Sequence, residues 1–137
     1  MKKLFIFFVV ISFALVGCNQ EDTIKEPKEP KEIQAETPFT VEERQSEGYK
    51  IIKEVVKSEE IKIVVEILEN AEWQENTKVE MALPPEYRFS LSSINYAIWV
   101  TPNRDRLEII PEGQSKYIKL PIKDSKILYK IITGKEL

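Results

Sequence analysis

The sequence predicts an α+β fold in which two amphipathic helices pack against an antiparallel sheet. An apolar pattern of helical period covers residues 59–72, patterns of period two follow over residues 79–120, and a second helical pattern precedes Gly134. A helix with one apolar stripe needs an apolar surface to cover, and an antiparallel sheet with one apolar face provides it. We therefore expect a two-layer domain over residues 49–137.

The first helix is predicted over residues 59–72 because its apolar side chains recur three and four positions apart. Ser58 is expected to cap it, with Glu59 and Glu60 in the first turn, where acids are favourable. The preceding residues 49–57 are rich in Ile and Val at positions that suit either a strand or the face of a helix, and a strand is the favoured prediction. The apolar positions of the helix are Ile61, Val64, Val65, Leu68 and Ala71.

Between the helices we expect a meander of four to five short strands. Apolar and polar residues alternate there, and turn residues or Pro84-Pro85 separate the runs. The alternating segments are Val79–Leu83, Tyr87–Leu91, Tyr96–Val100, Leu107–Ile109 and Tyr117–Leu120.

The closing helix is expected to begin with Asp124 or Ser125 as its cap and to end at Gly134. Its apolar face is predicted to consist of Ile127, Leu128, Ile131 and Ile132.

The N-terminus has the pattern of a lipoprotein signal peptide over residues 1–17. Lys2 and Lys3 precede thirteen residues, Leu4–Val16, of which only Ser12 is polar. A helix of that length measures about 20 Å, too short for a hydrocarbon core of about 30 Å. A cationic start, a short apolar run and small residues at its end are typical of a cleaved signal.

Leu15-Val16-Gly17-Cys18 resembles the lipobox at which lipoprotein signal peptides are cut. Cys18 is the only cysteine, so no disulfide within the chain is available to it. The resemblance implies a diacylglyceryl group on Cys18, and two acyl chains anchor a protein stably. We expect the chain on the extracytoplasmic face of the cell membrane.

Residues 18–48 are predicted to be an acidic tether. Residues 25–32 repeat the triplet Lys-Glu-Pro, which suits a polyproline II spacer. Thr40–Gly48 is expected to form a short helix with Thr40 as its cap. Residues 19–48 carry nine acids and four bases, whereas residues 49–137 carry fourteen of each. A neutral folded part does not predict nucleic-acid binding, which needs a basic surface.

The composition gives little support for catalysis, and we expect that the protein is not an enzyme and binds no cofactor. The chain has no histidine and no cysteine besides Cys18, which excludes imidazole and thiol chemistry. Carboxylates remain, but each has polar neighbours that favour a solvated surface role. They are Glu72, Glu75, Glu80, Glu86 and Glu108.

Trp99 is the strongest candidate for contact with a partner. By alternation it lies on the sheet face opposite Tyr96, Ile98 and Val100, and a solvent-facing tryptophan would make a binding anchor. Alternatively, a neighbouring loop or the tether covers it. Arg104 and Arg106 in the Arg104-Asp105-Arg106 turn would bind an anionic group, although a solvated turn is the simpler interpretation.

Residues 51–133 resemble the YhfM-like small lipoproteins of Gram-positive bacilli. The residues that carry the resemblance are Ala71-Glu72-Trp73, Met81–Phe89, Tyr96–Val100 and the closing segment Ser125–Ile132. The resemblance implies a lipoprotein of uncharacterised function and supplies no site residues.

Two functions remain as hypotheses. One is a membrane-tethered, non-enzymatic module that binds an envelope protein through the sheet face around Trp99. The other is a sensor of a small ligand or cell-wall component, for which a pocket lined by aromatic and polar groups would be expected.

Overall fold

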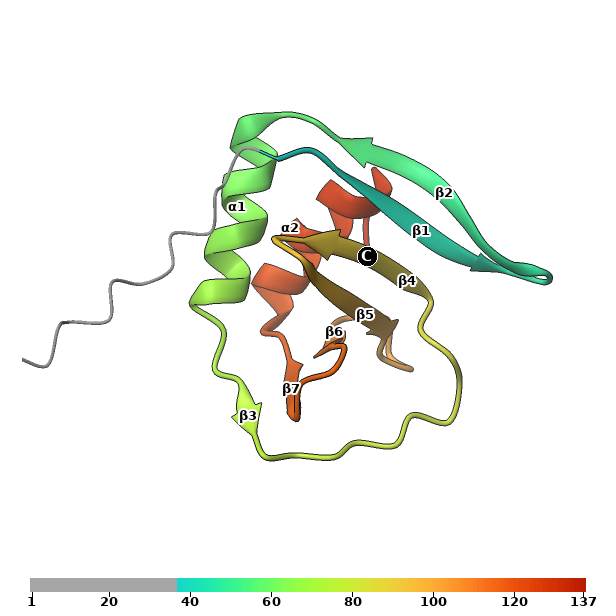
Figure 1. Cartoon of the computed structure of the whole chain (residues 1–137), viewed down its shortest axis with the longest axis vertical. Coiled ribbons are helices and arrows are strands. Elements are labelled where there is room, and N and C mark those ends of the chain that lie inside the picture. The colour runs from blue at the N-terminus through green and yellow to red at the C-terminus, as the bar shows by residue number, and fades with distance from the viewer. Residues whose placement is uncertain (1–36) are drawn as a thin grey trace, which may run out of the picture. The chain divides into compact units, whose positions relative to one another are not determined.

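The computed structural model describes residues 37–137, which form seven strands and two helices (Figure 1). The elements in chain order are β1 (Phe39–Gln45), β2 (Gly48–Val55), α1 (Ser58–Glu69), β3 (Gln74–Glu75), β4 (Tyr87–Leu91), β5 (Ile94–Val100), β6 (Leu107–Pro111), β7 (Lys116–Lys119) and α2 (Ile122–Thr133).

The strands form a single antiparallel sheet in the order β2-β1-β4-β5-β6-β7-β3. The α+β class is confirmed, and β4 to β7 form the expected meander. The count of four to five strands is too low, because β1 and β2 extend the sheet at one edge and β3 at the other.

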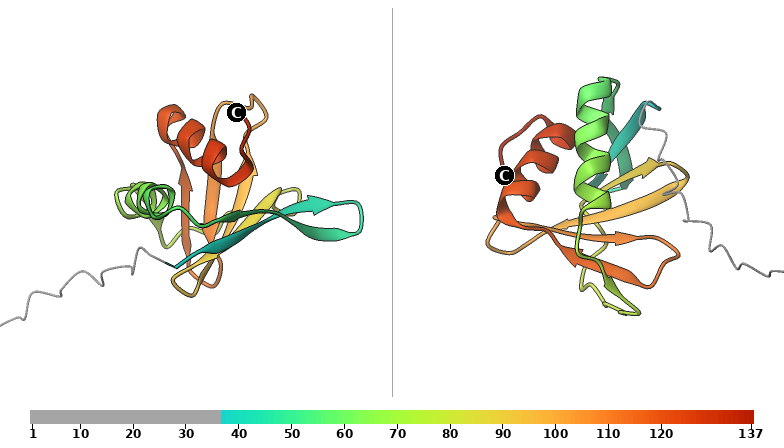
Figure 2. Two further views of the ribbon diagram at one scale, coloured as in Figure 1. Left: turned by 90° about the horizontal axis from the view of Figure 1, so that it is seen from above. Right: turned by 90° about the vertical axis from the view of Figure 1, so that its left-hand side faces the viewer.

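The expected helix over Thr40–Gly48 is wrong, because these residues belong to the β1–β2 hairpin. Phe39 and Val41 are buried while Thr40 is exposed, so the apolar period here is two and not 3.6. The β1 strand also pairs with β4, with Val41 opposite Phe89. The hairpin extends beyond the rest of the sheet (Figures 1 and 2).

The predicted strand over Val79–Leu83 is also wrong. Residues 76–86 form a loop that runs from β3 at one edge of the sheet to β4, which lies beyond β7, β6 and β5. Because β4 already pairs with β1 on one side and β5 on the other, no free ladder position next to it remains for this segment. We call residues 76–86 the strap.

Both helices are confirmed, with different termini from those predicted. The α1 helix ends at Glu69 rather than residue 72, and Lys57, not Ser58, is its N-cap residue. The α2 helix begins after Pro121 without a side-chain cap, so neither Asp124 nor Ser125 has the expected role. Gly134 ends α2 in the left-handed conformation at φ 75°, as expected of a C-terminal glycine.

The core lies between the helices and one face of the sheet. Tyr87, Ile98, Ile109 and Ile118 follow one another across β4 to β7 in register and are all buried. The helices cover this inner face, a roughly two-layer arrangement (Figure 2). Their buried residues are Ile61, Val64, Val65 and Leu68 from α1 and Ser125, Leu128, Tyr129, Ile131 and Ile132 from α2. Ile127 was expected in this face but is 36% exposed.

Candidate functional site

The face of the sheet opposite the helices, which we call the outer face, carries the sequence-predicted candidate Trp99. Ile98 is fully buried on the inner face, so its neighbour Trp99 points outward, in agreement with the alternation. Trp99 is only partly exposed, however. Its indole N–H donates a 2.7 Å hydrogen bond to the carbonyl of Leu83 in the strap. The strap is therefore the neighbouring loop that covers Trp99 in part.

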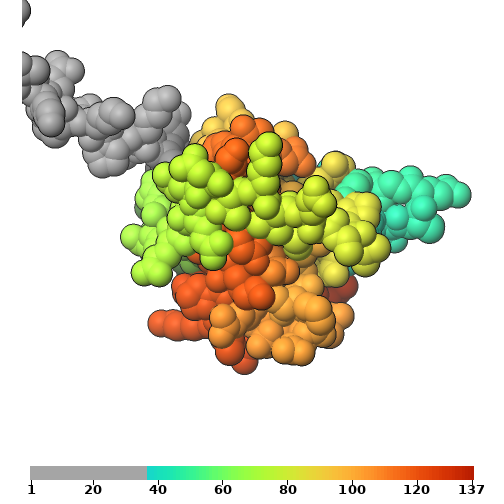
Figure 3. Space-filling model, turned by 90° about the horizontal axis from the view of Figure 1, so that it is seen from below, coloured from blue at the N-terminus to red at the C-terminus, as the bar shows by residue number. Residues whose placement is uncertain are grey.

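The strap crosses the sheet from the β3 edge to β4. Figure 3 shows this segment, in yellow-green, packed over the orange strands. Near its start, the Thr77 N–H donates to the Ser115 carbonyl at 3.2 Å. Along its length Thr77, Val79 and Met81 are partly buried, whereas Lys78, Glu80 and Ala82 are exposed. This alternation is the period-two pattern seen in the sequence. Here its partly buried side chains belong to a loop and not to a hydrogen-bonded strand.

Backbone carbonyls near the end of the strap accept bonds from outer-face side chains. Arg44 Nη1 donates to the Pro84 carbonyl at 2.8 Å. The Tyr49 hydroxyl donates to the Pro85 carbonyl at 2.7 Å. Proline has no N–H to donate to a ladder but retains its carbonyl, so the Pro84-Pro85 pair can still accept these two hydrogen bonds.

Arg88 lies at the centre of a polar cluster beside the strap. Its guanidinium carbon is 3.4 Å from the centroid of the Tyr49 ring, a cation–π contact. Its Nη2 is 3.3 Å from a carboxylate oxygen of Glu42, while its Nε is buried and has no hydrogen-bond partner. Planar stacking and a carboxylate partner together fix the orientation of this side chain.

A hollow of about 290 Å³ opens beside Arg88 on the outer face. Side chains from β1, β4 and β5 line it, together with one residue of the turn after β6. The lining residues are Thr40, Glu42, Arg88, Phe89, Ser90, Asn95 and Glu112. The two carboxylates, one guanidinium and three neutral polar groups make this lining predominantly polar.

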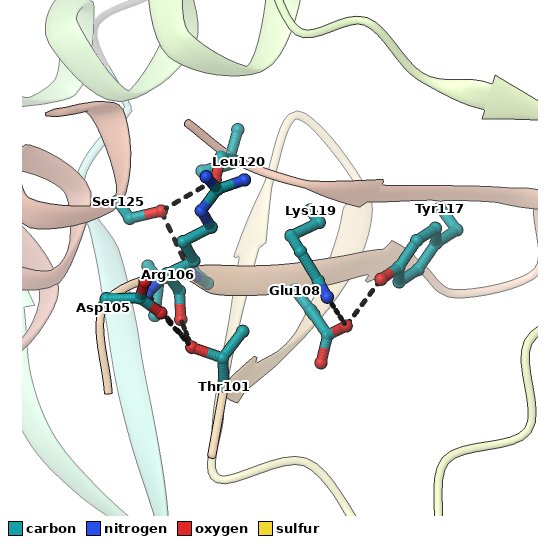
Figure 4. A network of polar contacts seen from close by, with 9 residues as sticks. Thr101, Asp105, Arg106, Glu108, Tyr117, Lys119, Leu120 and Ser125 are labelled. Carbon is teal, nitrogen blue, oxygen red and sulfur yellow. Dashed lines mark hydrogen bonds and ion pairs between the residues drawn. The ribbon is translucent and has the colours of Figure 1, made fainter. Parts of the chain in front are cut away.

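Glu108, one of the candidate carboxylates, is held by two neighbours on the outer face (Figure 4). The Tyr117 hydroxyl donates to its Oε1 at 2.6 Å, and Lys119 Nζ lies 3.4 Å from the same oxygen. Burial, and then the bond to Glu108, raises the pKa of Tyr117 to about 12. These contacts give Glu108 a structural role in joining β6 to β7.

The Arg104-Asp105-Arg106 turn is organised by Thr101 (Figure 4). The Thr101 hydroxyl donates to Asp105 at 2.9 Å and accepts from the Arg106 N–H at 3.1 Å. Arg104 has φ 55° and is exposed, and only Arg106 of the two arginines lines the adjacent hollow of about 380 Å³. Among the hydrogen bonds, ion pairs and cation–π contacts of residues 37–137, none joins Arg104 or Arg106 to Trp99.

Cys18 lies outside the described residues. Among residues 37–137, no helix is long and apolar enough to cross a membrane. In the same range, no group of three or more Cys, Asp or Glu side chains is arranged to hold a metal ion. Arg44, Tyr49 and Arg88 could not be predicted as outer-face contacts, because their roles depend on pairing between β1, β2 and β4.

Comparisons with family models, curated proteins and solved structures find no match. They do not identify the YhfM-like family, so that resemblance stays a prediction.

Proposed function

We propose that this chain is a non-enzymatic protein-interaction module, held at the extracytoplasmic face of the membrane by a diacylglyceryl group on Cys18. The N-terminal pattern of cationic start, short apolar run and Leu-Val-Gly-Cys supports the anchor. The resemblance to YhfM-like lipoproteins agrees with this location and adds no activity. The partner is an envelope protein that contacts the outer face.

A patch of aromatic, apolar and arginine side chains supports the interaction role. We define the outer patch as Tyr49, Ile51, Leu83, Arg88 and Trp99. Leu83 and Ile51 are 63% and 57% exposed, more than the other large apolar residues of the described chain. Tryptophan, tyrosine and arginine are the residues that most often contribute strongly to binding at protein interfaces.

Direct contacts join two pairs of residues within the outer patch, and Ile51 lies opposite a residue that contacts Arg88. Trp99 bonds the backbone of Leu83, and Arg88 stacks on Tyr49. Ile51 is paired in register with Glu42, the carboxylate that contacts Arg88. Because these bonds restrain the aromatic and arginine side chains, a partner would pay less conformational entropy to bind them.

The alternative, a sensor of a small ligand, is supported less well. The hollow beside Arg88 is lined by polar groups, with Phe89 as its single apolar residue. Small-molecule sites are more often mainly apolar with a few polar groups that fix orientation.

The anchor is tested by following a fatty acid label in cells that produce the full chain. We expect the wild-type chain to carry the label and to sediment with membranes, and Cys18→Ser to lack the label and leave the membrane fraction. An Asn19→Ser variant controls for a change beside the cleavage site. Labelling of Cys18→Ser would contradict the proposal.

The interaction is tested by affinity capture of the acylated chain from its own membrane. Leu83→Asp places a charge in the outer patch and leaves the backbone carbonyl that Trp99 uses. Trp99→Ala removes the anchor itself. Val56→Asp is the control, because Val56 is 55% exposed and lies outside the patch.

We expect both patch variants to lose a partner that the wild-type chain and Val56→Asp retain. If the patch variants retain every partner, or if Val56→Asp loses the same ones, the outer patch is not the binding surface.

A further inference from the structure

The two helices leave a groove with both apolar and charged lining residues on the side of the molecule opposite the outer face. The groove measures about 250 Å³ and is lined by Ile63 and Ile67 of α1 and Ile127 of α2, with polar residues at its margins. Ile63 and Ile127 are 38% and 36% exposed. Outward positions of amphipathic helices are normally polar, so two isoleucines facing each other there are an exception.

The helices on either side of this groove carry opposite charge. The α1 helix contains four glutamates and one lysine, whereas α2 contains three lysines and one aspartate. The acids Glu59, Glu66 and Glu69 are exposed, as are Lys123, Lys126 and Lys130, while Glu60 and Asp124 are partly buried.

These charges are not paired across the groove. Among the ion pairs of residues 37–137, those that involve the helices are Lys57–Glu60 and Lys130–Glu136, and neither joins α1 to α2. The last turn of α1 has no basic residue and ends at Glu69, so its acids lie at the negative end of the helix dipole. A nearby positive charge would stabilise this end of α1.

We propose that this helix face, defined as Ile63, Glu66, Lys123 and Ile127, binds the same face of a second copy of the chain about a two-fold axis. The helices run in roughly opposite directions and cross obliquely (Figures 1 and 2). An axis along the groove places α1 of one copy over α2 of the other. Ile63 then meets Ile127 of the second copy, and Glu66 meets Lys123.

Self-complementarity favours a second copy over an unrelated protein. A two-fold interface requires that each surface contain both members of every contact. The helix face satisfies this requirement for an apolar contact and for a charged contact. A partner of a single charge sign would match α1 or α2 but repel the other.

The size of the face predicts weak association. Each helix of twelve residues is about 18 Å long, so two helices from each copy make an interface at the small end of the specific range. Such an interface would be populated at the high local concentration of a membrane surface. This proposal does not depend on the outer patch.

The test uses two differently tagged full-length chains produced in the same cells. Capture of one tag measures how much of the other chain is associated with it. We expect the wild-type chains to co-purify, and Glu66→Lys on both chains, or Lys123→Glu on both chains, to reduce this several-fold. Each of those pairs places like charges together twice in the two-fold dimer.

Complementation separates a contact between copies from an effect on folding. When one chain carries Glu66→Lys and the other carries Lys123→Glu, both contacts in the mixed dimer have opposite charges, and co-purification should return to the wild-type amount. Glu54→Lys, an exposed change on β2, and Leu83→Asp, a change in the outer patch, should leave it unaltered.

Two results would overturn the proposal. The first is that the wild-type chains do not co-purify. The second is that the mixed pair of variants associates no better than either variant with itself.

Discussion

Ser125 shows how a single residue acquires its role from the fold. The sequence predicts it as a candidate cap for the last helix, but it is fully buried one turn inside the start of α2. Its hydroxyl accepts the Leu107 N–H at 2.9 Å and donates to the Leu120 carbonyl at 3.3 Å (Figure 4). Ser125 thus connects α2, the start of β6 and the end of β7.

Ser125→Ala should lower the free energy of unfolding by about 1–3 kcal/mol, because it leaves the Leu107 N–H buried without its partner. Urea unfolding of the folded chain measures this value. Asp124→Ala, which removes a neighbouring polar group without a bond of this kind, should cost less than Ser125→Ala. Equal effects would show that the buried hydroxyl has no special importance.

Tyr117 makes the stability of the folded chain depend on pH. Burial, and then the Glu108 bond, raises its pKa to about 12, compared with about 10 in an unfolded chain. The folded state therefore holds this proton more tightly, and the resulting stability is fully present below about pH 10. It is lost as the pH rises to about 12.

We expect the free energy of unfolding to decline between about pH 10 and 12, and Tyr117→Phe to make this decline shallower. Part of the decline should remain, since burial also raises the pKa of Tyr87 and Tyr96. Urea unfolding at a series of pH values measures both slopes. Identical slopes for the two proteins would contradict the assignment.

At the scale of elements, the strap shows why a period-two pattern does not by itself define a strand. Val79, Met81 and Leu83 alternate with polar or small residues, as in a ladder. In the structure Val79 and Met81 turn toward the protein and Leu83 is 63% exposed. Any extended segment with one side on an apolar surface shows this alternation, whether or not its backbone is paired.

Trp99→Phe should loosen the strap and leave the sheet intact, because it removes the N–H donor to Leu83 and keeps an aromatic ring. The expected cost is about 1 kcal/mol. Faster hydrogen exchange at residues 78–83, measured by mass spectrometry, is the diagnostic result.

Trp73→Phe is the matched control, since the Trp73 indole donates to the Leu68 carbonyl at 2.9 Å and not to the strap. If Trp73→Phe accelerates exchange in the strap as much as Trp99→Phe does, the Trp99 bond is not what holds it.

The whole molecule depends on one core between the sheet and the helices. Phe39, Phe89 and Tyr96 form a continuous aromatic row across β1, β4 and β5, with ring centroids 4.9 and 5.3 Å apart. On α2, the Tyr129 hydroxyl lies 3.2 Å from that of Tyr87, which joins the helix to the sheet. The last element of the chain is therefore packed against its central strands.

Adjacent residues of α2 should differ sharply in their contribution to this core. Leu128 is fully buried and Ile127 is 36% exposed. Leu128→Ala should lower the free energy of unfolding by about 2–5 kcal/mol, out of a total of about 5–15 kcal/mol for a domain of this kind. Ile127→Ala should cost much less. Similar losses at both positions would show that the two side chains do not differ in burial as described.

The two helices, the strand β2, the four strands from β4 to β7 and the outward direction of Trp99 could all be predicted from the sequence. Each of these depends on a local period, and the period follows from which side of one element is apolar. The end of α2 at Gly134 could also be predicted locally, since the left-handed conformation of a helix C-cap favours glycine. The sequence also supplied the lipoprotein hypothesis, which concerns residues outside the described range.

Which elements pair, and what covers the outer face, could not be predicted from the sequence. The pairing of β1 with β4, the β3 edge and the position of the strap depend on contacts between residues about 36 to 48 positions apart, such as Tyr49 with Pro85 and Val41 with Phe89. Local pattern carries no information about such partners. Trp99 therefore faces outward because of the local alternation along β5. It is partly covered because the tertiary structure places the strap beside it.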